Sequence, residues 1–151
     1  MPKEFSYRTT EGAIVPYEQV KSIKLPNNFL NHIDKISDKN PYALMIFEIS
    51  TKNTHLIPYS NNEALKIIMN VEALSPDFGL ELGVKFGKHN VKTKYSTGLC
   101  FTDHSCSWEG YIDPQLLKVS QKEFKNDLAE ISGIGKNNVY LEEICTQPVQ
   151  S

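Results

Sequence analysis

Hydrophobic and polar positions in the first half of the chain follow two periods, one typical of helices and the other typical of strands. Apolar residues over 29–36 recur one helical turn apart, and Asn27 or Asn28 can accept hydrogen bonds from the free N–H groups of a first turn. We expect this helix to end before Pro41, because the residue before a proline resists the helical conformation. A first strand region is expected to turn at residues 10–12. The strand regions predicted in this half are residues 5–15, 42–50 and 54–59.

In the middle of the chain, a capping box and a run of strict alternation predict a helix followed by a hairpin. The hydroxyl of Ser60 and the carboxylate of Glu63 can each satisfy a free N–H at a helix start, so we expect a helix over residues 61–74. Apolar and polar residues then alternate over 80–86, which is typical of a strand with one solvated face. A turn at residues 87–90 leads to further strands. These are predicted over residues 91–95 and 99–102.

The last part of the chain contains two helix-start signals and a final strand pattern. Asp113 precedes a proline, and Ser120 with Glu123 forms a second capping box before an apolar stripe. Gly133 suits the end of that helix, because a left-handed conformation costs glycine little. Residues 138–144 predict a strand.

Hairpins mixed with helices predict an α+β protein rather than a doubly wound one. We expect a single domain over residues 1–145, with a mainly antiparallel sheet built of hairpins and about three helices. A polar C-terminal tail is expected over residues 146–151. The length of 151 residues suits one domain, and the 40% of hydrophobic residues excludes a disordered chain.

Charge and cysteine usage exclude several classes of protein. A pI near 6.1 argues against nucleic-acid binding. No apolar run approaches the roughly 20 residues that cross a bilayer, and the first residues carry no secretory pattern, so we expect no membrane partner. The odd set of Cys100, Cys106 and Cys145 favours free thiols in a reducing, cytoplasmic compartment. We expect no cofactor.

Residues 100–109 concentrate reactive side chains, and a metal site is the first interpretation. Its ligands would be Cys100, Asp103, His104 and Cys106, which are residue types that zinc accepts. An extended strand separates positions 100 and 104 by about 13 Å, which no single ion bridges. The paired C-x-x-C spacing of structural zinc sites is also absent. We therefore expect no metal, and cysteines that behave as small buried apolar groups.

A cysteine nucleophile activated by a histidine base is the second interpretation. Cys100 or Cys106 would attack the substrate, but no local signature fixes either sulfur beside a ring nitrogen. The proton would be accepted by His104, His55 or His89. A small hydrolase or transferase of this kind is one alternative function. A small-ligand binding module, with its pocket between the sheet and the helix predicted over residues 61–74, is another.

A binding loop between a strand and a helix is the third interpretation, and it leads to the function that we favour. Tryptophan and tyrosine dominate interface energetics, and loops on a rigid frame are frequent binding sites. The expected contact residues are Asp103, His104, Trp108, Glu109, Tyr111 and Asp113. In the alternative to this role, Trp108 covers the core, with its N–H bonded to a carbonyl.

The acidic final third of the chain indicates the charge of the partner. Residues 101–151 carry eight acidic and four basic groups, and such an imbalance steers a basic partner, although it is also typical of an ordinary solvated surface. Rim charges are expected at Glu123, Asp127 and Glu130. We predict a protein-binding protein of bacterial type, an inhibitor, immunity protein or antitoxin, that blocks a basic site by charge and shape. The oligomeric state stays open.

Overall fold

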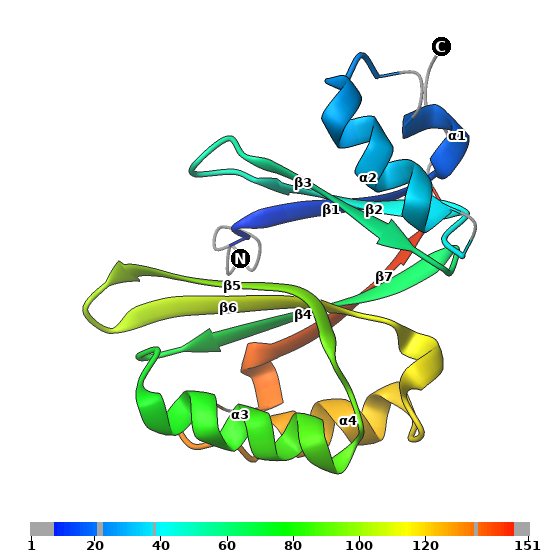
Figure 1. Cartoon of the computed structure of the whole chain (residues 1–151). Helices are drawn as coiled ribbons and strands as arrows, with labels where there is room; N and C mark the ends of the chain where they lie inside the picture. Colours follow the sequence, from blue (N-terminus) through cyan, green and yellow to red (C-terminus); the bar gives the residue numbers. More distant parts are fainter. Residues whose placement is uncertain (1–7, 21–22, 38, 135, 147–151) are drawn as a thin grey trace. The chain divides into compact units, whose positions relative to one another are not determined.

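The computed structural model describes residues 8–20, 23–37, 39–134 and 136–146 (Figure 1). These residues divide into two compact units. One unit contains residues 8–9 and 65–143, and the other contains residues 10–64 and 144–146. The single domain expected over residues 1–145 stays a prediction. Most of the expected polar tail, residues 147–151, lies outside the described residues.

The unit formed mainly by residues 10–64 is a three-stranded antiparallel sheet with two helices. Its strands, in the spatial order β1-β2-β3, are β1 (Thr10–Pro16), β2 (Tyr42–Glu48) and β3 (Thr54–Tyr59). The helices are α1 (Tyr17–Val20) and α2 (Asn27–Ser37). Val15, Val20 and Ala43 form a buried cluster that joins the first helix to the sheet.

Most sequence predictions for this unit are confirmed. The helix expected after Asn27 or Asn28 is α2, and the two strands expected between residues 42 and 59 are β2 and β3. The turn expected at residues 10–12 is wrong, because Gly12 lies inside β1 and pairs with Ile46. Residues 5–7 of that prediction lie outside the described residues.

The unit formed mainly by residues 65–143 contains a four-stranded antiparallel sheet with the spatial order β5-β6-β4-β7. The strands are β4 (Glu63–Val71), β5 (Thr93–Thr102), β6 (Ser105–Ile112) and β7 (Val139–Cys145). The main helices are α3 (Pro76–Lys88) and α4 (Gln121–Leu128). The chain order β4-α3-β5-β6-α4-β7 is that of the split βαβ, or ferredoxin-like, unit.

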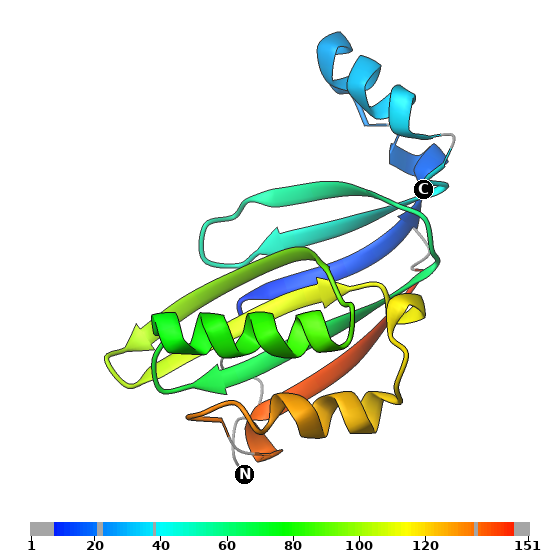
Figure 2. The same cartoon turned by 60° about the horizontal axis from the view of Figure 1, so that its bottom comes forward.

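Both helices cover the same face of this sheet (Figure 2). Alternate residues of the strands and one stripe from each helix form one apolar core. Its buried members include Leu65, Ile67, Met69, Trp108 and Ile112 from the sheet, and Phe78, Leu82, Phe86, Phe124 and Leu128 from the helices. The order of elements therefore places α3 and α4 side by side over the sheet, each with its other face turned away from the core.

The helix predicted over residues 61–74 is wrong, because this segment is strand β4. Its residues are buried almost without interruption, since β4 is a central strand between β6 and β7. A continuous apolar run of this kind does not distinguish a buried strand from a buried helix. The branched residues Ile67 and Ile68 favour the strand.

The strand predicted over residues 80–86, and with it the hairpin expected through residues 87–90, is also wrong. This segment belongs to helix α3, whose buried residues Phe78, Leu82 and Phe86 recur every four positions. Alternation made Leu82 and Phe86 look like one face of a strand, but Leu80 and Val84, the other apolar residues of that pattern, are exposed. Ser75 begins the helix by accepting a hydrogen bond from the backbone N of Phe78 at 3.2 Å.

Predictions for the last part of the chain are confirmed. Asp113 begins the 3-10 helix η1 (Pro114–Leu116), and Ser120 begins α4 by accepting from the backbone N of Glu123 at 3.1 Å. Gly133 has a φ of +84°, and the final strand is β7. The α+β class is therefore confirmed, although sheet predominates and the described residues contain four α-helices rather than about three.

A buried ion pair lies on the sheet face opposite the helices. Lys66 of β4 and Glu109 of β6 are 1% and 0% exposed, and their Nζ and Oε1 atoms are 2.5 Å apart. The backbone N and the hydroxyl of Thr9 both donate to the other carboxylate oxygen of Glu109. The ammonium of Lys66 also lies 5.7 Å from the centre of the Tyr111 ring. This cluster fixes the pairing of the two central strands, because a buried charge without its partner is costly.

No helix among the described residues is long and apolar enough to cross a membrane.

Replacing Lys66 with methionine should lower the free energy of unfolding by about 3–5 kcal/mol, because the buried Glu109 carboxylate loses its counter-charge. The double variant Lys66→Met with Glu109→Leu should recover most of that loss, since no unpaired charge is left. Urea unfolding of both variants measures the difference. A double variant no more stable than the single one would contradict this role of the pair.

Candidate functional site

The aromatic and acidic residues predicted to form a binding loop belong instead to strand β6. Trp108 is 9% exposed and packs edge-on against Phe86, with ring centres 5.8 Å apart. A Cβ at Gly110 would lie 2.3 Å from the Trp108 ring, so the indole covers that glycine. Glu109 and Tyr111 point to the opposite face and are fully buried. The expected surface is therefore wrong at these positions, and Trp108 covers the core, as in the alternative.

The remaining predicted contact residues fall into two separate places. Asp103 and His104 are exposed at the turn between β5 and β6. Asp113 is buried and caps η1, where its carboxylate accepts from the backbone N of Gln115 at 3.0 Å. The expectation that Asp113 is exposed is therefore wrong too. Glu123, Asp127 and Glu130 lie together on α4 and the turn that follows it.

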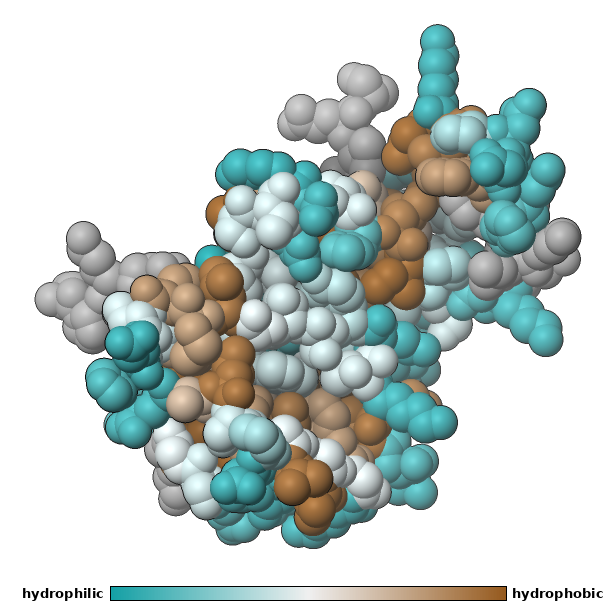
Figure 3. Space-filling view, turned by 60° about the vertical axis from the view of Figure 1, so that its left-hand side comes forward, coloured by the Kyte–Doolittle hydropathy of each residue, from teal (hydrophilic) through white to brown (hydrophobic). Residues whose placement is uncertain are grey.

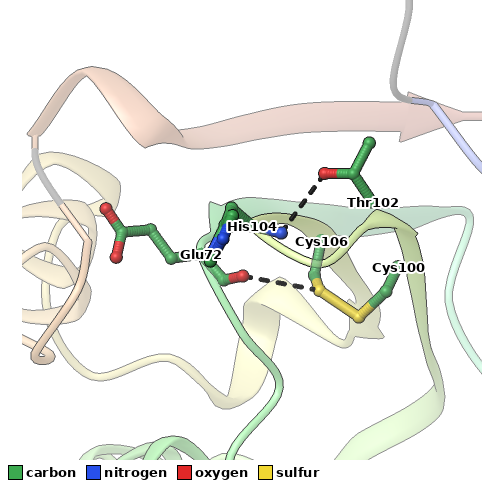
Figure 4. The surroundings of a disulfide bond; sticks show 5 residues. All are labelled: Glu72, Cys100, Thr102, His104 and Cys106. Carbon is green, nitrogen blue, oxygen red and sulfur yellow. Dashed lines mark hydrogen bonds between the residues drawn. A yellow bond between two sulfur atoms is a disulfide. The ribbon is translucent and has the colours of Figure 1, made fainter.

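Cys100 and Cys106 form a disulfide across the β5–β6 hairpin, where they are direct partners in the strand pairing (Figure 4). The free thiols expected from the odd cysteine count are therefore wrong for this pair, and Cys145 alone is free and exposed. The sulfur of Cys106 contacts the backbone carbonyl of Glu72 at 3.8 Å, without a hydrogen of its own to donate. Beyond the disulfide, the backbone N of His104 donates to the hydroxyl of Thr102 at 3.2 Å.

This bond also decides the chemistry open to the cysteines. A disulfide sulfur is not a thiolate, so neither Cys100 nor Cys106 is a nucleophile in this state. His55 contacts Glu48 instead, with Nε2 and Oε1 3.4 Å apart. Among the described residues, no group of three or more His, Cys, Asp or Glu side chains is placed to hold a metal ion. The pocket expected beside a helix at residues 61–74 is wrong, since that helix is strand β4.

Asp127 is the centre of a charged cluster between α3 and α4. Its Oδ1 lies 2.8 Å from Nζ of Lys85, and its Oδ2 lies 2.5 Å from Nε2 of His89. Nζ of Lys88 lies 3.3 Å from both oxygens. Lys85 also bonds Glu130 at 2.8 Å, which joins that exposed carboxylate to the cluster. A hollow of about 410 Å³ opens beside it, lined partly by Glu123, Asn126 and Glu130.

The protonation of this cluster is set by competing effects on Asp127. Burial alone raises the pKa of the Asp127 carboxyl, but hydrogen bonds from Lys85, His89 and Lys88 outweigh it and hold that pKa well below its usual range. The hydrogen bonds that Lys85 donates, first to Asp127 and then to Glu130, raise the pKa of the Lys85 ammonium. Asp127 is thus an ionised residue that links α3 to α4. Basic groups of α3 and its C-cap already balance its charge.

An acidic groove of about 530 Å³ lies at the start of α3. Its lining includes Glu72, Asp77 and Glu81 but no described lysine, arginine or histidine. Val71, Phe78 and Leu80 add apolar side chains to its lining. We define the acidic groove by these six residues. Figure 3 shows how hydrophobic residues (brown) reach the surface beside hydrophilic ones (teal) on one side of the molecule.

The carboxylate of Glu81 is held in place by the turn after α4. The backbone N of Ser132 donates to Oε2 of Glu81 at 2.9 Å, and this bond lowers the pKa of the Glu81 carboxyl. Gly133, in the same turn, lies between the acidic groove and a smaller hollow of about 270 Å³. That hollow is lined partly by Asn70, His104 and Asn138. The Glu81 carboxylate is thus oriented by the fold rather than free to turn away from the groove.

Sequence reasoning missed the acidic groove because its carboxylates come from the end of one strand and from one helix that was read as a strand. Ser75 followed by Pro76 was the available signal, since serine is a good N-cap and proline suits a first turn. A helix starting there would have placed Asp77 and Glu81 one turn apart on one side.

No family model matches the chain, and a search of curated proteins finds no significant match. The function is therefore inferred from the geometry and charge of the acidic groove.

Alkylation should count the cysteines. In the unfolded, unreduced protein, iodoacetamide should add one group, at Cys145, and prior reduction should raise the count to three. Intact-mass spectrometry measures both values. The Cys145→Ser variant is the control and should take up no group before reduction. Three groups added without a reductant would contradict the disulfide.

The Asp127 cluster should make stability depend on pH. Folding lowers the pKa of Asp127, so this residue stabilises the fold only while it is ionised. Its contribution to the free energy of unfolding is complete above its unfolded pKa of about 3.9 and is lost as the pH falls through its folded pKa. Asp127→Asn should cost about 2 kcal/mol at neutral pH and flatten the dependence below pH ~4. Urea unfolding at several pH values measures this. Glu123→Gln, on the exposed side of the same helix, should change little. An unchanged acid limb in the Asp127 variant would exclude this role.

Proposed function

We propose that the protein binds another protein and blocks it, as an inhibitor, immunity protein or antitoxin does, by receiving a basic segment in the acidic groove. The observation that supports this is the lining of the groove, which combines three carboxylates with three apolar side chains and no described basic side chain. The proposal keeps the basic partner that the sequence predicted. It moves the contact from β6 to the start of α3.

Arginine is the side chain that this groove suits best. Its planar guanidinium can bind a carboxylate through two parallel hydrogen bonds, while its aliphatic stem lies on apolar surface. Asp77 and Glu72 are exposed at the groove and are available to such a contact. Phe78 and Leu80 offer the apolar surface for the stem. A lysine would gain charge attraction there but not the paired hydrogen bonds.

Orientation of the Glu81 carboxylate is what separates this groove from an ordinary acidic surface. Glu81 is already fixed by Ser132, so less side-chain freedom is lost when a cation binds. In the Asp127 cluster, by contrast, three basic groups already surround the buried carboxylate. The rim charges predicted at Glu123 and Glu130 lie beside that cluster and do not line the groove, so they are not part of the proposed contact.

The compartment is not part of the proposal. The cytoplasmic location was predicted from reduced thiols, and the disulfide between Cys100 and Cys106 removes that reasoning. The hydrolase or transferase alternative depended on the same sulfurs and is not proposed.

A short arginine peptide tests the groove directly. In an NMR titration of the full chain with acetyl-Ala-Arg-Ala-Arg-Ala-amide, amide shifts should concentrate at Glu72, Asp77, Glu81 and Ser132. Glu72→Lys and Asp77→Lys should each weaken binding about tenfold or more, equivalent to about 1.4 kcal/mol. Added salt should weaken it further, because the contact is largely electrostatic.

Two controls make the titration decisive. The same peptide with glutamate in place of arginine should give no shifts at the groove, and Glu123→Lys, which leaves the groove intact, should bind the arginine peptide within about twofold of the unaltered protein. Shifts spread over all acidic residues, or an equal loss in Glu123→Lys and Asp77→Lys, would contradict the proposal.

A further inference from the structure

The outer face of α3 carries the two most exposed large hydrophobic side chains among the described residues. Leu80 and Val84 are 69% and 70% exposed, although they lie on a helix whose other face is packed into the core. Four residues apart, they are neighbours on the helix surface. Exposed apolar side chains that cluster on one rigid element are typical of an interface.

Two glycines lie on the same outer face of α3. Gly83 and Gly87 are exposed, and a Cβ added at either would meet no atom within 4 Å. Glycine weakens a helix by about 1 kcal/mol relative to alanine, so the outer face gains nothing in stability from them. Their effect on shape is to leave a hollow beside Val84, into which a side chain of an opposing helix can enter.

Opposite charges stand at the two ends of this face. Asp77 is in the first turn of α3 and Lys88 is its last residue, and the helical period places both on the same side of the line through Leu80 and Val84. Lys88 is 62% exposed while its ammonium lies 3.3 Å from Asp127 of its own chain. It therefore has donors that remain directed to solvent.

We propose that this face pairs with the same face of a second copy of the chain, with the two α3 helices antiparallel about a two-fold axis. The face is complementary to itself in that arrangement, because Asp77 of each copy comes opposite Lys88 of the other. Each contact is then made twice, as two-fold symmetry requires. Charge complementarity selects the antiparallel pairing, since a parallel pair would place like charges together.

The same register also brings the apolar side chains into place. With Asp77 opposite Lys88, Leu80 of one copy falls over the gap bounded by Gly83, Val84 and Gly87 of the other. A leucine seated between residues of the facing helix is the packing that holds helix pairs together, and small residues let the axes come closer. The exposed leucine and the two glycines are thus complementary parts of one contact.

This interface goes beyond the proposed function, although Asp77 and Leu80 belong to both surfaces. The helix has 13 residues and spans about 20 Å, so the pair buries less than the roughly 1,600 Å² of a standard stable complex. The dimer is therefore weak and reversible. We expect it to be absent at a protein concentration of about 10 µM and populated at about 1 mM.

Sedimentation equilibrium of the full chain over that range should show a monomer–dimer equilibrium. Gly83→Leu should shift the protein to monomer by at least tenfold in dissociation constant, because the added side chain fills the gap that Leu80 enters. The same variant should unfold at an equal or higher temperature than the unaltered protein, since leucine favours a helix more than glycine does. Gly79→Leu is the matched control. It lies about 100° round the helix from Leu80, away from Val84, and should leave the dimer intact.

Exchanging the charges tests the register. Asp77→Lys and Lys88→Glu should each weaken the dimer, and the double variant should restore it, because the ion pairs re-form in reverse. Lys88→Glu also repels Asp127 within its own chain, which the Gly83→Leu variant does not, so the glycine variant decides the matter if the charge variants unfold.

A protein that stays monomeric at 1 mM, or a dimer unaffected by Gly83→Leu, would overturn the pairing. In the second case another surface would join the copies. The Glu72→Lys variant separates this outcome from the proposed function. It should lose the arginine peptide and keep the dimer, because Glu72 lies outside α3.

Discussion

The packing of one face of α3 onto the four-stranded sheet is the interaction on which the site and both proposed surfaces depend. Phe78, Leu82 and Phe86 enter the core, where Phe86 meets the edge of Trp108. Burial of three such side chains contributes on the order of 5–8 kcal/mol. It also fixes the rotation of the helix about its axis. That rotation places Glu81 in the acidic groove, brings Lys85 to Asp127, and turns Leu80 and Val84 outward.

The sequence predicted correctly those parts of the fold in which the capping or turn residues and the hydrophobic pattern indicate the same element. Ser120 and Gly133 mark the ends of the region around α4, and turn residues separate β2 from β3. Besides the turn expected at residues 10–12, the failures are two segments in which the period was ambiguous. In α3, leucine and valine at positions 80 and 84 completed a false alternation, since exposed apolar side chains obscure the helical stripe. In β4, burial on both faces removed the alternation of a strand.

The candidate site was less predictable than the fold, because its residues meet only through tertiary structure. Glu72 follows a strand, Glu81 belongs to a helix, and Ser132 lies in a turn about 50 residues later that holds the Glu81 carboxylate. The charge of residues 101–151 predicted a basic partner for the final third of the chain, whereas the carboxylates of the acidic groove come from residues 72–81. Trp108 also could not be placed from sequence. A lone tryptophan is consistent with an interface or a core, and only the register of β6 shows that it points into the core.

The most direct test of the rotation of α3 is the solvent exposure of its methyl groups. With a soluble paramagnetic probe, and at a concentration too low for the proposed dimer, NMR signals from Leu80 and Val84 should broaden strongly while those of Leu82 stay sharp. Leu80 and Val84 are exposed on the single chain, whereas Leu82 is buried. Equal protection of Leu80, Leu82 and Val84 is the result expected of a strand with alternate residues buried. That outcome would contradict the rotation of α3, and with it the acidic groove and the outer face.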